Sequence, residues 1–259
     1  MVGVALGARF SLATNRLRYC GPPGSEDLLY GAATEGRNPV AARAALEKFE
    51  ALMPYLEAIG RKNGRDPFDP EVVEAYWIGN ELLDAFDRSD FLDLLDRLVA
   101  RGLPRSIARG LAERLPPDPI PHHVFHVAFV GVGNVTGHVA TTLANMEACR
   151  PSWGTVRSIH DGSFEAEGPA LARGERGLEI GPAHRATHPW DPRLLPDLAV
   201  GDMVAFHWSM PVLRLSPDRA TRLRAYTERS LSAANGARPA ERPPAPGTGR
   251  LSRDPTQGD

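Results

Sequence analysis

Two side chains able to bind a metal or act as a nucleophilic pair lie near the ends of expected strands. Cys149 precedes a strand that Gly154 opens, and His207 lies in the apolar run after the Gly201–Asp202 turn. A thiolate and a neutral imidazole are ligands for soft or borderline metals such as iron or zinc. A thiol beside a histidine is also the start of a nucleophilic pair. The spacing leaves a third alternative open, in which both are ordinary core residues.

Three further side chains are candidates for residues that contact the two possible metal ligands without binding the metal themselves. Cys20 precedes a stiff Gly-Pro-Pro-Gly turn and is either a buried small residue or a second thiol at the same site. Residues His122 to Val132 are β-branched and aromatic, which predicts a strand. On a strand His122 and His126 share one face and His123 points away. We therefore expect Cys20, His122 and His126 as possible outer partners of the metal ligands.

A glycine-rich segment offers a different function. Gly131, Gly133 and Gly137 follow the expected strand and precede a helix expected over residues 141–149, and Asp161 lies downstream. This order imitates the fingerprint of dinucleotide-binding domains. The alternative function is thus a dinucleotide-binding oxidoreductase that uses the Gly131–Gly137 loop. Against it, the residues after Asp161 offer one clear helix, where such a domain needs several strand–helix repeats.

Helical periodicity dominates residues 38–115, after a Gly- and Pro-rich segment in which no regular structure is predicted. Apolar residues recur at spacings of three and four from Leu46 to Ile59, with a kink expected at Pro54. Capping and proline signals start the other helices at Asn38-Pro39, Asp69-Pro70, Ser89 and Pro104. These patterns predict an N-terminal helical domain over residues 1–119.

Short strand signals separated by Gly, Pro and Asp follow a proline-rich linker at residues 116–121. A helix is expected over Pro217–Ser230, with Ser216 as its cap. The pattern favours a small β-barrel with a C-terminal helix over residues 120–231. The predicted fold class is therefore α+β, a helical bundle followed by the barrel. Residues 232–259 have few apolar anchors and are predicted to form a disordered tail.

Composition narrows the class of protein. A formal net charge of −2 argues against a general nucleic-acid binder. Two cysteines permit one disulfide at most, so we expect a cytoplasmic protein with reduced thiols. The longest apolar run, around Val124 to Val132, is far shorter than the ~20 residues of a membrane helix. The N-terminus lacks the basic lead of a signal peptide.

Two sequence segments carry a family resemblance. In CRPSWGTVRSI a cysteine is followed by four residues and a strand-opening glycine, and VGDMVAFHW places a histidine after a Gly-Asp turn and an apolar run. Together they resemble the HypC/HupF family of hydrogenase assembly chaperones, over Glu147 to Leu231. Cys149 takes the place of the family's essential cysteine and His207 of its histidine. The other matching positions are Gly154, Gly201, Asp202 and Val204.

The resemblance implies an OB-like barrel and an accessory role, without catalysis, in nickel–iron hydrogenase maturation. Chaperones of this family hold or pass on the Fe(CN)₂CO group and bind the large-subunit precursor. Iron at Cys149 and His207, and partners among the precursor and other maturation proteins, are therefore the expectations here. Two departures stand out. Cys149 is internal, whereas the family's cysteine follows the initiator Met, and the helical half has no counterpart in the family.

Overall fold

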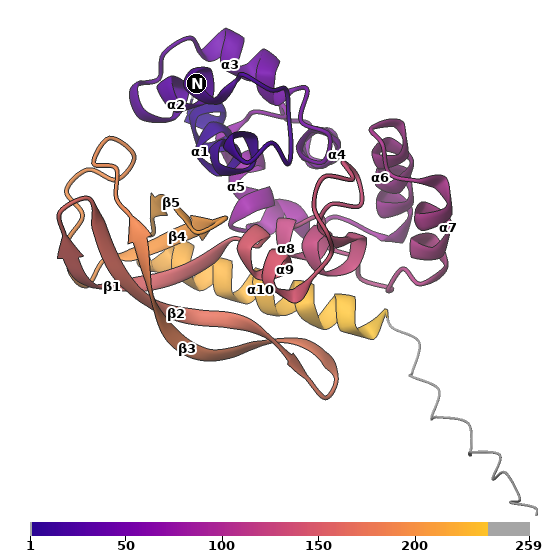
Figure 1. Cartoon of the computed structure of the whole chain (residues 1–259). Coiled ribbons are helices and arrows are strands. Elements are labelled where there is room, and N and C mark those ends of the chain that lie inside the picture. Colours follow the sequence, from indigo (N-terminus) through magenta and orange to yellow (C-terminus); the bar gives the residue numbers. More distant parts are fainter. Residues whose placement is uncertain (1, 238–259) are drawn as a thin grey trace, which may run out of the picture.

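The computed structural model describes residues 2–237 and has the predicted α+β class. Helices form the N-terminal part, and the strands lie together in the C-terminal part (Figure 1). The helices up to the first strand are α1 (Val2–Arg16), α2 (Glu26–Glu35), α3 (Pro39–Leu46), α4 (Leu52–Lys62), α5 (Pro70–Trp77), η1 (Glu81–Leu83), α6 (Arg88–Ala100), α7 (Arg105–Glu113), α8 (His123–Phe125), η2 (His126–Gly131) and α9 (Leu143–Cys149).

The strands form one open antiparallel sheet. They are β1 (Ser152–His160), β2 (Ser163–Gly174), β3 (Gly177–Pro189), β4 (Met203–His207) and β5 (Met210–Arg214), in the order β3-β2-β1-β4-β5. In the described part of the chain β3 and β5 remain edges, so the predicted closed barrel is wrong. Short strands with turn signals are typical of sheets and barrels alike, and closure depends on edge pairing that the pattern does not encode.

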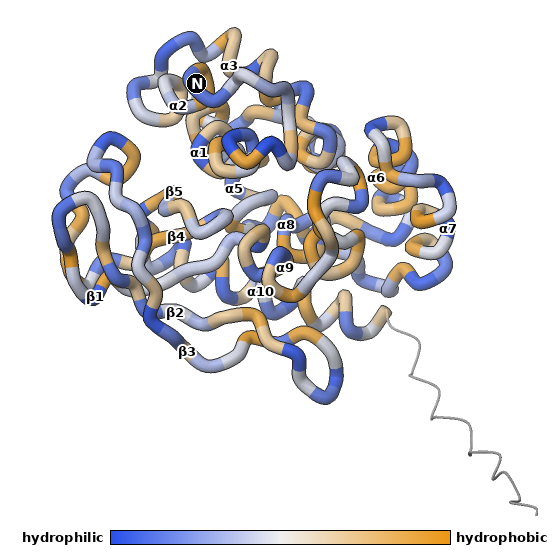
Figure 2. The backbone as a smooth tube through the Cα atoms, in the orientation of Figure 1, coloured by the Kyte–Doolittle hydropathy of each residue, from blue (hydrophilic) through white to orange (hydrophobic). Residues whose placement is uncertain are grey.

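Helix α10 (Pro217–Gly236) joins the two parts of the molecule. It contacts β3 on one side and α8 and η2 on another (Figure 1). One hydrophobic core cluster contains helical residues such as Phe10 and Phe91 together with Ala205 and Val212 of the sheet. The helices therefore pack directly on β4 and β5. Figure 2 shows hydrophobic segments where these elements meet, while the loop joining β2 to β3 is hydrophilic.

The predicted strand over His122–Val132 is wrong, because this segment is helical. It forms α8 and the π-helical turn η2. Phe125 is fully buried there, with its ring 5.1 Å from that of Phe91 and 4.9 Å from that of Phe129. Burial among helices outweighs the β-preference of the side chains. The expected order of a strand, a glycine-rich loop and a helix is therefore not formed in this segment.

Helix starts are predicted better than helix lengths. Asp69 and Ser216 accept hydrogen bonds from the first turns of α5 and α10, as expected for N-caps. Asp87, and not Ser89, caps α6. The stripe from Leu46 to Ile59 is split between α3 and α4, and Pro54 lies in the first turn of α4, where backbone N–H groups lack helical partners anyway.

Two terminal segments differ from expectation. Residues predicted to be irregular at the N-terminus form α1, where a Cβ on Gly3 would lie 2.0 Å from the carbonyl oxygen of Phe68. Such close backbone contact requires glycine. At the other end α10 continues to Gly236, past the start of the tail predicted over 232–259. Residues 238–259 lie outside the described residues.

A buried ion pair holds α9 against the sheet. The Arg150 guanidinium is fully buried, bonds Glu147 at 2.7 Å and donates to the carbonyl oxygen of Pro169 at 2.6 Å. Glu147 also accepts from the backbone N–H of Leu171 at 2.6 Å. The end of α9, and with it Cys149, is thus fixed relative to β2.

Replacing Glu147 by Ala is expected to lower the free energy of unfolding by about 3 kcal/mol, because it leaves the buried Arg150 charge without its carboxylate. Urea denaturation measures the change. Glu35→Ala is the control, since Glu35 pairs with Arg37 on the surface and its loss should cost under about 0.5 kcal/mol. Equal small changes in both variants would contradict the structural role of this pair.

Candidate metal centre

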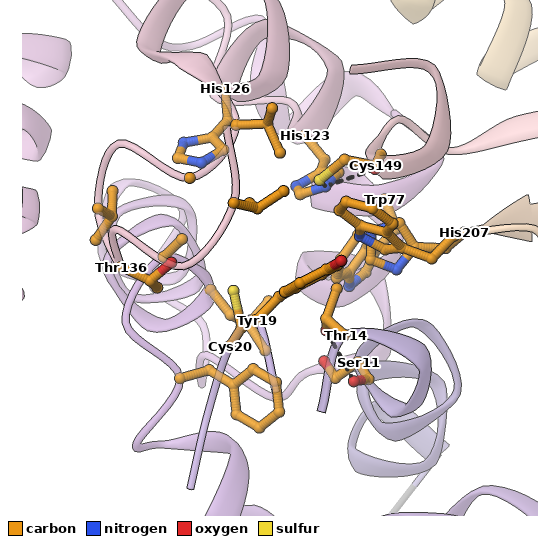
Figure 3. Close-up of a pocket in the computed structure, with 18 of the residues that line it drawn as sticks. Ser11, Thr14, Tyr19, Cys20, Trp77, His123, His126, Thr136, Cys149 and His207 are labelled. Carbon is orange, nitrogen blue, oxygen red and sulfur yellow. Dashed lines mark hydrogen bonds between the residues drawn. The ribbon is translucent and has the colours of Figure 1, made fainter. Parts of the chain in front are cut away.

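His123, Cys149 and His207 form a buried group that could hold a metal ion. One ligand atom of each lies within 4.8 Å of those of the other two. The exposed fractions of the three residues are 6%, 7% and 1%. They come from α8, the end of α9 and the end of β4, and face one another across a small space (Figure 3).

Strand pairing brings Cys149 and His207 together. Strand β1 begins just after Cys149, and its first residue, Ser152, pairs with Phe206 beside His207. The backbone N–H of Trp208 donates to the carbonyl oxygen of Ala148 at 2.5 Å. The end of α9 and the end of β4 therefore meet at one corner of the sheet, as the sequence segments around the two residues predict. Their role as metal ligands stays a prediction.

The ring of His207 is oriented by the first helix. Its Nδ1 lies 2.5 Å from the carbonyl oxygen of Phe10, so Nδ1 carries the proton and Nε2 presents its lone pair. Among the described residues Nε2 has no hydrogen-bond partner, although it is buried. Metal-binding histidines commonly use one nitrogen for the ion and donate the other N–H to a carbonyl or carboxylate. His207 has this arrangement before any ion is considered.

His123 can present a second imidazole nitrogen to the same point. Its Nδ1 lies 2.7 Å from the hydroxyl of Tyr76, and its Nε2 lies 3.0 Å from the Cys149 carbonyl oxygen and 3.5 Å from the Cys149 Sγ. Metal–sulfur and metal–nitrogen bonds of 2.3 and 2.1 Å at a tetrahedral angle separate the two atoms by about 3.6 Å. The tyrosine hydroxyl both donates and accepts, so it can serve either tautomer of His123.

Burial keeps the three side chains neutral. Desolvation raises the pKa of the Cys149 thiol well above its usual range and lowers the pKa of His207 to about 4. The pKa of His123 is lowered too, by burial and then by neighbouring imidazoles. Neutral imidazoles are ready ligands, whereas the thiol must lose its proton to a binding cation. A buried, protonated thiol is a poor nucleophile, so the group suits metal binding better than nucleophilic catalysis.

A cavity of about 50 Å³ adjoins the three ligands. One water molecule requires ~10–15 Å³ on this measure, so the cavity has room for a ligand of a few atoms. Its walls are mostly apolar and aromatic. Trp77 contacts both imidazoles, with ring centroids 4.4 Å from His123 and 5.0 Å from His207, and Trp208 packs on Tyr19 at 4.7 Å.

The three expected outer residues have different places. His126 lines the cavity, and its Nδ1 lies 3.0 Å from the Tyr55 hydroxyl. Cys20 lines the cavity from the side opposite Cys149 (Figure 3). Burial, and then the charge of Glu50, raise the Cys20 pKa to about 12.

His122, in contrast, does not reach the cavity. Its Nδ1 accepts from the Val124 N–H at 3.3 Å and lies 3.4 Å from the Ser230 hydroxyl of α10. This residue caps α8 and contacts α10, away from the ligand group. The prediction that His123 points away from the site is wrong for the same reason as the strand prediction. On the helical turn of α8, it is His123 that meets Cys149.

The glycine-rich loop forms part of the cavity wall. Gly133 lines the cavity with a φ of 80°, and a Cβ there would lie 1.8 Å from the carbonyl oxygen of Val139. The loop thus needs its glycines to pack on itself. It is preceded by a helix, and the paired strands among residues 2–237 are antiparallel, so the arrangement that a dinucleotide fingerprint requires is not formed there.

The fold and site define a class of protein in which helices and an open antiparallel sheet enclose a thiol–imidazole centre. Residues 1–241 match DUF6390, a family of unknown function, and the chain belongs to this family. No curated protein and no solved structure matches the chain. These comparisons show no relation to the HypC/HupF family. In the part of the chain that the structure describes, no helix has the length and apolar character needed to cross a membrane.

The buried imidazoles predict a loss of stability in acid. Burial lowers the pKa of His122 to about 3 and the pKa values of His126 and His207 to about 4. The unfolded chain binds protons at these groups near pH 6.5, while the folded protein does not. Stability is therefore complete above pH 6.5 and decreases toward pH 4, by about 1.4 kcal/mol per pH unit for each group.

Urea denaturation between pH 7.5 and 4.5 measures this slope. His126→Gln removes one of the buried groups and should flatten the profile, whereas His160→Gln on the exposed surface should leave it unchanged. A profile that is flat below pH 6.5 in the unmodified protein would contradict the burial of neutral imidazoles.

Proposed function

We propose that this protein is an accessory protein of nickel–iron hydrogenase maturation. It presents the Cys149 thiolate to the iron of an Fe(CN)₂CO group, with His207 as second ligand and His123 as third. The iron group is cargo, held before it passes to the large-subunit precursor. The protein acts in the cytoplasm and catalyses no reaction of its own.

The convergence of Cys149 and His207 is the observation that carries the proposal. The two lie far apart in sequence, and each belongs to one of the two segments that resemble the HypC/HupF chaperones. Their ligand atoms belong to a single group within 4.8 Å. Residues matched separately on sequence thus meet at one place, at the start of β1 and the end of β4, with a long helix after the sheet.

The donor set is one that iron can use. One thiolate and two imidazoles suit borderline metals such as low-spin iron, and equally zinc. The unpartnered Nε2 of His207 and the 3.5 Å between Cys149 Sγ and His123 Nε2 fit ligands of one ion. The adjoining cavity favours an ion with small ligands of its own. Apolar walls suit carbon monoxide, and polar groups such as Ser11 and Thr136 can serve cyanide.

The helical part, which has no counterpart in the HypC/HupF family, supplies residues that orient the two imidazoles and line the cavity. Phe10 orients His207, Tyr76 orients His123, and Cys20 lies across the cavity. We assign to the remaining surface of this helical part the docking of the large-subunit precursor or another maturation protein.

The test is anaerobic purification from cells that mature a nickel–iron hydrogenase, followed by iron analysis and infrared spectroscopy. Bound iron should come with cyanide and carbonyl stretching bands. Cys149→Ala should lose both the iron and the bands, because it removes the anionic ligand. His207→Ala should weaken iron binding at least tenfold, the lower end of the loss seen when only an outer partner of a ligand is removed.

Cys20→Ala is the matched control, since it removes the other thiol of the same cavity and should keep the iron and the bands. Circular dichroism establishes that each variant is folded. Iron without the cyanide and carbonyl bands, or bands of equal strength in Cys149→Ala, would overturn the proposal.

A further inference from the structure

Trp208 occupies a backbone position that a tryptophan rarely adopts. It follows His207 in the two-residue turn between β4 and β5, with φ of 53°, and Ser209 has φ of 58°. Turns of this kind favour Asn and Gly, because left-handed backbone is costly for large side chains. Strain of this sort is commonly stored at functional sites. We therefore expect the side chain of Trp208 to have a role that offsets the cost of its backbone conformation.

The side chain of Trp208 lies against the candidate metal centre. The ring lines the cavity, packs with the cluster that contains Cys149, and contacts Tyr19. Its backbone N–H bonds the carbonyl oxygen of Ala148, the residue before Cys149. The turn between β4 and β5 and the end of α9 therefore hold the indole beside the Cys149 sulfur.

The indole N–H is buried and, within residues 2–237, has no hydrogen-bond partner of ordinary geometry. Cys149 supplies the one ionisable side chain in the apolar cluster against which the indole packs. A neutral thiol is a weak acceptor and a thiolate is a strong one. The unsatisfied donor is therefore suited to the sulfur only in its deprotonated, metal-bound form.

We propose that the indole N–H of Trp208 donates a hydrogen bond to the metal-bound thiolate of Cys149, which makes Trp208 a positioning residue of the centre. Hydrogen bonds to a ligand sulfur tune the bound metal and strengthen its retention. This inference rests on the metal site of the proposed function, and not on the identity of its cargo. It applies to any ion that binds the three ligands.

The test uses Co²⁺ alone, with the full-length protein, and reads the thiolate-to-cobalt charge-transfer band in the near ultraviolet. Benzothienylalanine at position 208 keeps the shape of the side chain and replaces the N–H by sulfur. It should move the band to lower energy, because the sulfur lone pairs lose a stabilising donor. The dissociation constant for Co²⁺ should rise about tenfold, as for other outer partners of metal ligands. Trp208→Phe should shift the band in the same direction.

The outcomes separate the two proposals. A thiolate band of unchanged energy and a dissociation constant within twofold in both variants would overturn the role of the indole and leave the metal site intact. Absence of a thiolate band in the unmodified protein would overturn the metal site, and with it both proposals. Tyr19→Phe keeps the aromatic contact to Trp208 and should leave the band where it is.

Discussion

The hydrogen bond from His207 to the carbonyl oxygen of Phe10 joins the two parts of the molecule at the candidate centre. It joins residues 197 positions apart in the chain and is buried on both sides. Phe10 also stacks on Trp77 at 4.6 Å, and Trp77 in turn contacts both imidazoles. The first helix is therefore a wall of the site, and the geometry at the end of β4 depends on how α1 packs on the sheet.

Many polar groups are buried in one apolar interior, and this burial limits their charge and requires hydrogen-bond partners for them. Four imidazoles and a thiol are nearly inaccessible to water, and each must be neutral or partnered. Tyrosine hydroxyls bond His123 and His126, and backbone groups bond the Nδ1 atoms of His207 and His122. Among the buried side-chain atoms that have no hydrogen-bond partner in the described residues are the Nε2 of His207 and the indole N–H of Trp208, and both residues line the cavity beside Cys149. These two atoms are therefore free to bond a ligand held in the cavity.

The sequence predicted the positions that depend on local signals. Strand β1 begins at Ser152, two residues before the predicted Gly154, and β4 begins just after the Gly201–Asp202 turn, so Cys149 and His207 lie close to strand boundaries as their spacing predicts. Asp69 and Ser216 cap helices because their side chains act on the next turn of the chain. These interactions are short in sequence, and a pattern of residue types records them well.

What the sequence did not predict depends on contacts far along the chain. Residues 122–132 have the composition of a strand and become helical because they are enclosed by α4, α6 and α10. His123 was missed with them, since its partner Tyr76 is not adjacent in sequence. The spacing of His123 and His126 was a usable signal, because residues three apart share one face of a helix and point to opposite faces of a strand. Whether the sheet closes is likewise decided by edges that no local pattern describes.

Division of the chain into a helical and a sheet domain separates residues that the site needs together. The candidate ligands Cys149 and His207 belong to the predicted domain over residues 120–231, as does His123. The groups that orient the imidazoles, Phe10 and Tyr76, belong to residues 1–119. Since metal ligands are held in place by their outer partners, neither part carries a preorganised centre alone. The helical half is thus part of the candidate centre itself, because its residues orient the imidazoles that meet Cys149.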